Sequence, residues 1–238
     1  MMPKYVVLTG AGISAESGIK TFRDSNGLWE GHRIEDVATP EGFHRNPTAV
    51  YEFYNQRRAQ LLSAEVHPNP AHQALADLAR DLDGDLILIT QNVDDLHERA
   101  GHKNVKHMHG ELLKARCMKC EAVYELCASF DAETPCAHCG AVNSLRPDIV
   151  WFGEMPFFMP EIEAYLTKCR YFISIGTSGH VYPAAGFVEM AKYAGAECTE
   201  LNLEASQNAA AFDIGIYGAA GETVPKWCAE IREKENAR

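Results

Sequence analysis

Short apolar runs rich in valine, isoleucine and leucine recur along this 238-residue chain, and stretches with helical periodicity separate them. The runs predict strands at residues 5–10, 85–90, 171–176, 197–203 and 212–218. Residues 69–82 predict a helix that begins at an Asn-Pro step, and a closing helix is predicted from Pro225 onward. Strands that alternate with helices are typical of βαβ units. The predicted fold class is therefore α/β, with a Rossmann-like parallel sheet.

Two regions interrupt this alternation. One runs from residue 20 to 62 and holds a loop followed by a helix that begins near residue 46. The other, residues 112–146, shows little periodicity. We predict a Rossmann-like domain formed by residues 1–30, 63–111 and 147–238, and a smaller helical and zinc-binding lobe, inserted into it, formed by residues 31–62 and 112–146. A site would lie between the two, at the carboxyl ends of the strands.

A glycine-rich stretch, "LTGAGISAESG", follows the first predicted strand. Gly10, Gly12 and Ala15 fit the pattern G-x-G-x-x-A, a tight turn that lets backbone N–H groups approach a pyrophosphate, and Ser14 could add a hydroxyl donor. A structural turn with incidental glycines would give the same letters. The acidic residue that a dehydrogenase carries on its second strand, about 20 positions later, is missing. The turn therefore favours nucleotide binding without hydride transfer.

Four cysteines form two tight pairs. Cys117 and Cys120 make one Cys-x-x-Cys, and Cys136 and Cys139 make another after fifteen intervening residues. Four thiolates at this spacing satisfy tetrahedral zinc and leave no open position, so the predicted zinc is structural. Four unligated thiols are the alternative. Cys127 lies between the pairs without a partner of its own, and we leave it out of the ligand set.

The net charge, the apolar runs and the N-terminal sequence exclude some classes of function. A net charge of −11 argues against general affinity for nucleic acid, because such binding needs cations to displace phosphate counterions. No apolar run approaches the length of a membrane span, so no membrane partner is expected. The N-terminus shows no signal for export, so we expect a cytoplasmic location.

Six motifs occur in a fixed order: "GAGISAESGIKTFRD", "TQNVDDLHERAG", "HMHGEL", the two cysteine pairs, "GTSGHVYPAAG" and "ELNLE". With them the chain resembles the sirtuins, the NAD-dependent protein-lysine deacylases, over roughly residues 5–230. It is most similar to the bacterial group that includes the sirtuin-5-like desuccinylases. The resemblance implies NAD as co-substrate of the larger domain and acylated-lysine proteins as substrates. It also implies nicotinamide and O-acyl-ADP-ribose as products, and zinc as a structural ion.

A histidine is the base of the reaction that the resemblance implies. With the zinc satisfied by sulfur, neither His107 nor His109 is needed as a ligand. If residues 105–109 form a strand, the two side chains point the same way, and alternation does not separate them. The adjacent Gly110 and the resemblance favour His109.

The segment "QNVD" is implied to supply two further catalytic residues, Asn92 for the ribose and a water, and Asp94 for the nicotinamide carboxamide. Asp94 and Asp95 could instead be N-terminal charges on the helix that follows. "GTSG" could likewise be only a turn. The implied cofactor-binding residues are Gly10, Ala11, Gly12, Ser14, Ala15, Phe22, Arg23, Trp29, Gln91, Asn92, Val93, Asp94, Gly176, Thr177, Ser178, Asn202, Leu203, Glu204 and Ala220.

The segment "FYNQRRAQ" indicates which acyl groups the protein could bind. On a helix Tyr54 and Arg57 share a face, and together they could hold the carboxylate of a succinyl, malonyl or glutaryl lysine. The alternative is a solvated Arg57 and Arg58 with Tyr54 in the core. A small residue, Ala38, would leave room in the acyl pocket. Because bacterial members with this pair commonly remove acetyl and succinyl groups, we expect both activities. The predicted substrate-binding residues are Tyr54, Arg57, Val150, Phe152, Gly153 and Glu154.

Three other functions compete with deacylation. An NAD-linked oxidoreductase would need the glycine turn but would leave the zinc lobe and His109 without a purpose. A zinc-ribbon module for nucleic acid is opposed by the acidic charge. A mono-ADP-ribosyltransferase would share the first chemical step.

Overall fold

The computed structural model describes residues 3–19, 28–29 and 31–237. Its main sheet has six parallel strands in the order β11-β10-β9-β1-β4-β5. The strands are β1 (Tyr5–Thr9), β4 (Leu86–Thr90), β5 (Lys106–His107), β9 (Tyr171–Ile175), β10 (Glu197–Asn202) and β11 (Ile214–Tyr217).

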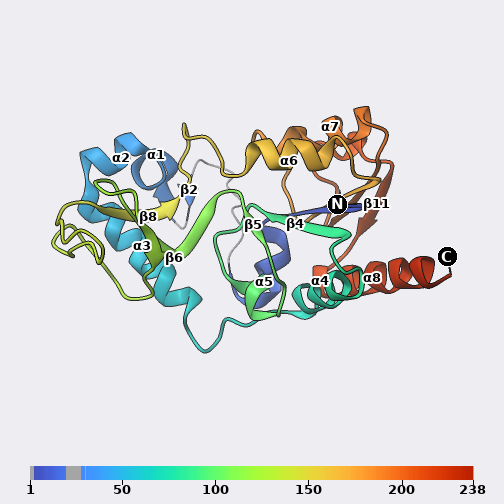
Figure 1. The fold of residues 1–238 in the computed structure, drawn as a ribbon, viewed down its shortest axis with the longest axis horizontal. Coiled ribbons are helices and arrows are strands. Elements are labelled where there is room, and N and C mark those ends of the chain that lie inside the picture. Colours follow the sequence, from blue (N-terminus) through green and yellow to red (C-terminus); the bar gives the residue numbers. More distant parts are fainter. Residues whose placement is uncertain (1–2, 20–27, 30, 238) are drawn as a thin grey trace.

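Helices cover both faces of this sheet (Figure 1). Successive side chains of a strand point to opposite faces, so Tyr5 and Val7 pack with α4 and α8, whereas Val6 and Leu8 pack with α6 and α7. These helices are α4 (Pro70–Asp81), α6 (Met159–Leu166), α7 (Phe187–Tyr193) and α8 (Ala220–Asn236). Burial on both faces explains why the strands read as continuous apolar runs. The five strands and the helix predicted over residues 69–82 are confirmed.

The closing helix begins five residues earlier than predicted. It starts at Ala220, and Pro225 lies inside it. The Glu16 carboxylate accepts a hydrogen bond from the Gly221 N–H at 2.9 Å and so caps the exposed first turn. This partner is distant in sequence, and the local pattern around Pro225 gave no sign of it.

A smaller lobe, at the left of Figure 1, carries a second, antiparallel sheet in the order β7-β6-β8. The sheet packs against α3, whose Val50 and Phe53 join Leu112 and Leu145 in one apolar cluster. β6 and β8 both cross the boundaries predicted at residues 111 and 147, and the division into domains remains a prediction. The elements are α1 (Ile34–Val37), α2 (Pro40–Arg45), α3 (Pro47–Leu61), β6 (Gly110–Cys117), β7 (Val123–Glu125) and β8 (Leu145–Ile149).

The remaining elements are short: the hairpin β2 (Leu28–Trp29) and β3 (His32–Arg33), the helix α5 (Leu96–Arg99), and the 3₁₀ turns η1 (Ala11–Ser17), η2 (Ala184–Gly186) and η3 (Ala209–Ala211). Among the described helices, none combines the length and the apolarity needed to cross a membrane.

Candidate active site

Two glycine turns meet where the strand order reverses. From β1 the chain continues to β4 and β5 on one side and to β9, β10 and β11 on the other, which makes the β1–β9 boundary a topological switch point. The Gly12 N–H donates to Gly176 O at 2.8 Å, and the Gly10 N–H donates to Ile175 O at 2.9 Å. A Cβ on Gly12 would lie 2.7 Å from Gly176 Cα. The glycines therefore allow the turns to pack together. The N–H groups of Gly10 and Gly12, expected to face a pyrophosphate, instead donate hydrogen bonds to carbonyl groups of the protein.

A cavity of about 810 Å³ opens at this edge of the sheet, a size typical of small-molecule sites. It extends from the glycine turns to α3 and to the segment after β8, and Ala38 also lines it. The predicted site residues on its walls are Gly10, Ala11, Gly12, Ser14, Tyr54, Arg57, Gln91, Asn92, Val93, Asp94, His109, Val150, Phe152, Gly153, Glu154, Gly176, Thr177, Ser178, Asn202 and Glu204.

Other predicted cofactor residues lie elsewhere. In the described part of the chain, Ala15, Leu203 and Ala220 are not on the cavity wall. Ala15 is exposed on η1, and Leu203 is 59% exposed. Phe22 and Arg23 lie outside the described residues, as does the side chain of Trp29. The roles of all these residues remain predictions.

A buried hydrogen-bond network forms the cavity floor. Asn92 Nδ2 donates to Gly10 O and to Ser14 Oγ, both at 3.1 Å, and Ser14 Oγ donates to Asp94 Oδ2 at 3.1 Å. The Leu96 N–H donates to Asp94 Oδ1 at 3.2 Å, so Asp94 also caps the start of α5. Burial raises the pKa of Asp94 to about 6, although the bonds from Leu96 and Ser14 oppose the shift. Asp94 thus lines the cavity and caps a helix at once.

His109 has the hydrogen bonding of a neutral imidazole. Its Nδ1 lies 3.1 Å from Gln91 O, and because a carbonyl can only accept, Nδ1 carries the hydrogen. The neutral ring then offers the lone pair of Nε2. Burial lowers the pKa of His109, against the opposing effect of the Gln91 bond. At neutral pH the ring is therefore ready to accept a proton.

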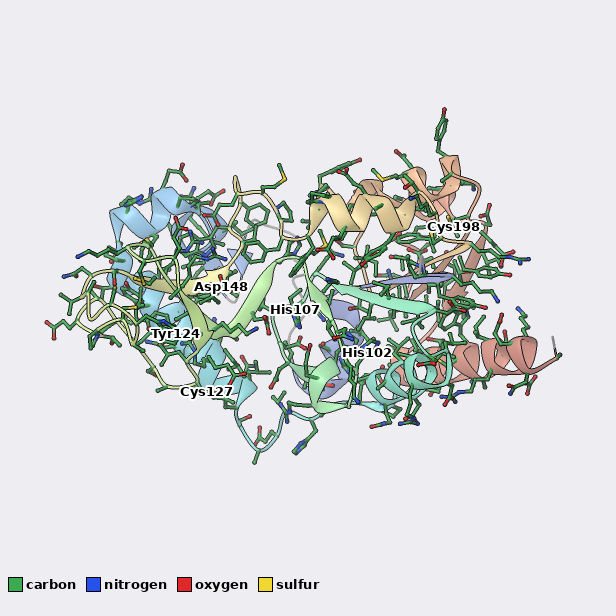
Figure 2. The ribbon with its side chains drawn as sticks, viewed as in Figure 1. His102, His107, Tyr124, Cys127, Asp148 and Cys198 are labelled. Carbon is green, nitrogen blue, oxygen red and sulfur yellow. The ribbon has the colours of Figure 1, made fainter. Side chains whose placement is uncertain are left out.

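His107, which Figure 2 places between the two lobes, has a different surrounding. Its Nε2 lies 2.9 Å from Glu98 Oε1, and its Nδ1 lies 3.2 Å from Asn92 O. Burial opposes a charge on this ring, but the bond and charge of Glu98 outweigh burial and raise the pKa of His107. The two histidines do not point the same way, since β5 ends at His107 and Gly110, with φ of +84°, starts a new strand. His107 fixes the "QNVD" segment, while His109 faces the cavity.

The four paired cysteines form one cluster whose sulfur atoms all lie within 4.8 Å of one another. Cys117 Sγ lies 3.8 Å from Cys139 Sγ, and Cys120 Sγ lies 3.8 Å from Cys136 Sγ. Zinc–sulfur bonds of about 2.3 Å in a tetrahedron require sulfur–sulfur distances of about 3.8 Å, so the donor set fits zinc. Cys127 is not in this cluster, and the described cavity walls include none of the four cysteines.

The far wall of the cavity comes from α3. Tyr54 is 1% exposed and accepts a hydrogen bond from Trp151 Nε1 at 2.9 Å. The Arg57 guanidinium lies 4.7 Å from the Phe53 ring centroid, and its buried Nε and Nη1 have no hydrogen-bond partner among the described residues. Arg58 is buried, at 1% exposed, and burial lowers its pKa to about 10. The alternative of a solvated Arg57 and Arg58 pair is therefore wrong for Arg58.

Glu154, a predicted substrate residue, has its carboxylate engaged within the protein. Arg146 Nη1 donates to Glu154 Oε1 at 2.6 Å and Arg146 Nη2 to Glu154 Oε2 at 2.9 Å. The Trp151 N–H also donates to Glu154 Oε2, at 2.8 Å. Glu154 thus fixes the turn that carries the cavity wall.

Two residues at this site were not predicted from the sequence. Trp151 lies between the predicted Val150 and Phe152, and its indole reaches Tyr54. His72 Nε2 lies 3.4 Å from Ser14 Oγ, behind the cavity floor. The only sequence signals were a tryptophan within a predicted substrate segment and a histidine in the first turn of a predicted helix.

A parallel sheet with a cavity at its switch point, a neutral histidine on the wall and a separate four-cysteine cluster define a nucleotide-binding α/β enzyme with a structural metal site. The sequence pattern of the Sir2 family matches residues 10–183. A protein of Pasteurella multocida named "NAD-dependent protein deacylase" is 57% identical over 228 residues, which cover 96% of this chain and 97% of that protein.

Solved structures of Sir2 proteins resemble this chain as well. A Sir2 homologue in complex with NAD is 38% identical with a TM-score of 0.86, and the match covers 97% of this chain and 90% of that one. A Sir2 homologue bound to a myristoylated histone peptide is 35% identical with a TM-score of 0.74, covering 98% and 93%. The chain therefore belongs to the Sir2 family. The predicted fold class is confirmed, and the predicted NAD-dependent deacylase is confirmed at the level of the enzyme class. The names of the relatives do not specify the acyl group.

Proposed function

We propose that this protein removes both acetyl and succinyl groups from protein lysines with NAD as co-substrate, and that malonyl and glutaryl lysines are further substrates. The products are nicotinamide, free lysine and O-acyl-ADP-ribose. The proposal keeps the cytoplasmic location expected from the sequence.

The proposal that the protein removes acyl groups with a carboxylate rests on one observation, the pair of buried donors on Arg57. Arg57 lines the cavity, and its buried Nε and Nη1 have no acceptor within the described structure. Buried cationic donors without an acceptor are costly, and a carboxylate is the acceptor that a guanidinium binds best. A succinyl group would bring such a carboxylate, and Tyr54, one helical turn away, would add its hydroxyl. An acetyl group is smaller and has no need of Arg57.

On the nucleotide side, the glycine turns and residues 176–178 would hold NAD at the switch point, a placement that parallel sheets favour. His109 would accept the proton of a ribose hydroxyl through Nε2, and Asp94 would receive the nicotinamide carboxamide. Asn92, fixed by Gly10 and Ser14, would order the ribose. Zinc would take no part, because its four sulfur ligands leave no open position.

The test compares succinyl-lysine and acetyl-lysine peptides of one sequence. Replacing Arg57 with methionine removes a charge-assisted contact, so kcat/KM for the succinyl peptide should fall about 10- to 150-fold. The acetyl peptide should change less than about twofold, since its acyl group has no carboxylate. Arg80→Met, at an exposed position on α4, is the matched control and should change neither value. Equal losses on both peptides would contradict the carboxylate pocket.

A further inference from the structure

One hydrogen bond holds the hydroxyl of Tyr54, a residue on the cavity wall. Trp151 Nε1 and Tyr54 Oη are 2.9 Å apart, and both side chains are at most 2% exposed. An indole N–H can only donate, so Tyr54 Oη is the acceptor of this bond, and the hydrogen of the phenol is not used in it. Burial raises the pKa of Tyr54, against the opposing effect of the Trp151 bond, so the phenol remains a donor.

The tryptophan is itself held from three sides. The Arg146 guanidinium lies 3.5 Å from the Trp151 ring centroid, and Phe43 packs on the same ring at 5.2 Å. The backbone N–H of Trp151 donates to Glu154, and the Glu154 N–H donates back to Trp151 O at 2.9 Å. Arg146 closes the arrangement with its forked pair to Glu154 and a bond to Ile149 O at 2.8 Å. An indole locked in this way cannot turn its N–H away from Tyr54.

We propose that Trp151 is a positioning residue for acidic acyl groups: its indole N–H occupies one lone pair of Tyr54 Oη and directs the phenol hydrogen toward the acyl carboxylate held by Arg57. A hydroxyl that accepts one hydrogen bond becomes a stronger donor in the next. Trp151 also lines the cavity, but in this role it acts through Tyr54, and the pair Arg146 and Glu154 sets its orientation. The inference rests on the proposed function, since it needs a carboxylate in the pocket.

The experiment is a double-mutant cycle with Trp151→Phe and Tyr54→Phe, measured on the succinyl and acetyl peptides. Phenylalanine keeps an aromatic ring under Arg146 and removes the N–H. For the succinyl peptide, Trp151→Phe should raise KM roughly five- to tenfold with kcat changed less than about twofold, as expected for one hydrogen bond. KM for the acetyl peptide should stay within about twofold. In the Tyr54→Phe background, Trp151→Phe should have no further effect on the ratio of the two peptides.

Two results would overturn the inference. One is an equal loss on both peptides, which is what a packing role gives. The other is a double variant whose loss is the product of the two single losses, which would show that the indole does not act through the hydroxyl. If Tyr54→Phe and Arg57→Met fail to discriminate the peptides, the carboxylate pocket is wrong and this inference falls with it. If they discriminate and Trp151→Phe does not, the inference alone is wrong.

A second variant tests the positioning role if Trp151→Phe unfolds at too low a temperature to be assayed. Glu154→Gln keeps the tryptophan and removes the charge that holds Arg146, so the indole loses its lock. The succinyl KM should rise by about two- to threefold more than the acetyl KM. An unchanged ratio in a folded Glu154→Gln protein would contradict the positioning role.

Discussion

Replacing Asp94 with asparagine is expected to make the folded protein more stable at pH 7 and to abolish its deacylase activity. Asp94 is buried, and its carboxyl has a pKa of about 6 against an ordinary value of 3.8. An acid with a higher pKa in the folded state holds its proton more tightly when folded, so its ionisation lowers stability. This loss is complete above about pH 6 and disappears below about pH 4.

The shift of about two pKa units corresponds to about 3 kcal/mol at pH 7 and to about 1.5 kcal/mol at pH 5. Asparagine removes this loss, but its amide N–H₂ cannot accept the Ser14 hydrogen bond, which lowers the gain by about 1 kcal/mol. Asp94→Asn should therefore raise the free energy of unfolding by about 2 kcal/mol at pH 7 and by less than about 1 kcal/mol at pH 5.

Urea unfolding followed by circular dichroism at the two pH values measures both numbers. Asp148→Asn is the control, because Asp148 is also buried but bonds to Arg116 Nε at 2.8 Å. Loss of that charge-assisted bond should lower the free energy of unfolding by about 1–3 kcal/mol. If Asp94→Asn lowers stability at pH 7 as Asp148→Asn does, then burial of the ionised Asp94 does not destabilise the folded protein, and the reasoning is refuted.

Further expectations concern the base, the metal and the glycine turns. His109→Ala should lower kcat/KM for both peptides by about 10²- to 10⁴-fold while the melting temperature stays within a few degrees; retained activity would remove His109 as the base. In the unchanged protein the part of the activity that depends on neutral His109 should be lost only below pH 6.5, because burial holds its pKa under that ordinary value, and a loss at higher pH would contradict this. Chelation of zinc, or Cys120→Ser, should unfold the smaller lobe in a separate early transition seen by calorimetry, and an unchanged melting curve would speak against a structural zinc. Gly176→Ala places a Cβ 2.4 Å from Ile13 N and should lower the free energy of unfolding by about 3 kcal/mol or more. Gly195 also has a positive φ, +92° against +63° for Gly176, but no described atom lies within 4 Å of its added Cβ, so Gly195→Ala should lower the free energy by only about 1–2 kcal/mol. Equal losses would show that the contact between the turns is unimportant.

The elements that the sequence predicted well are those whose burial is local in sequence. β1, β4 and β9 are covered on both faces, so each appears as an unbroken apolar run, and α4 shows its apolar side at helical spacing. The cysteine cluster was predictable because two Cys-x-x-Cys pairs leave few other arrangements.

What could not be predicted depends on partners that are distant in sequence. The start of α8 is set by Glu16, which meets Gly221 from 205 positions away. His107 differs from His109 because it is bonded to Glu98. Strand alternation could not distinguish the two histidines, because the strand ends at His107. The burial of Arg58 depends on Phe130, whose ring centroid lies 4.8 Å from its guanidinium. Sequence periodicity reports which face of an element is buried, but not which side chain it meets there.

The most direct measurement of the central claim is mass spectrometry of the small-molecule products formed from NAD with the succinyl peptide and with the acetyl peptide. The account predicts nicotinamide in both reactions, with O-succinyl-ADP-ribose from the first and O-acetyl-ADP-ribose from the second. Formation of NADH, transfer of ADP-ribose to the protein, or turnover of the acetyl peptide alone would contradict it.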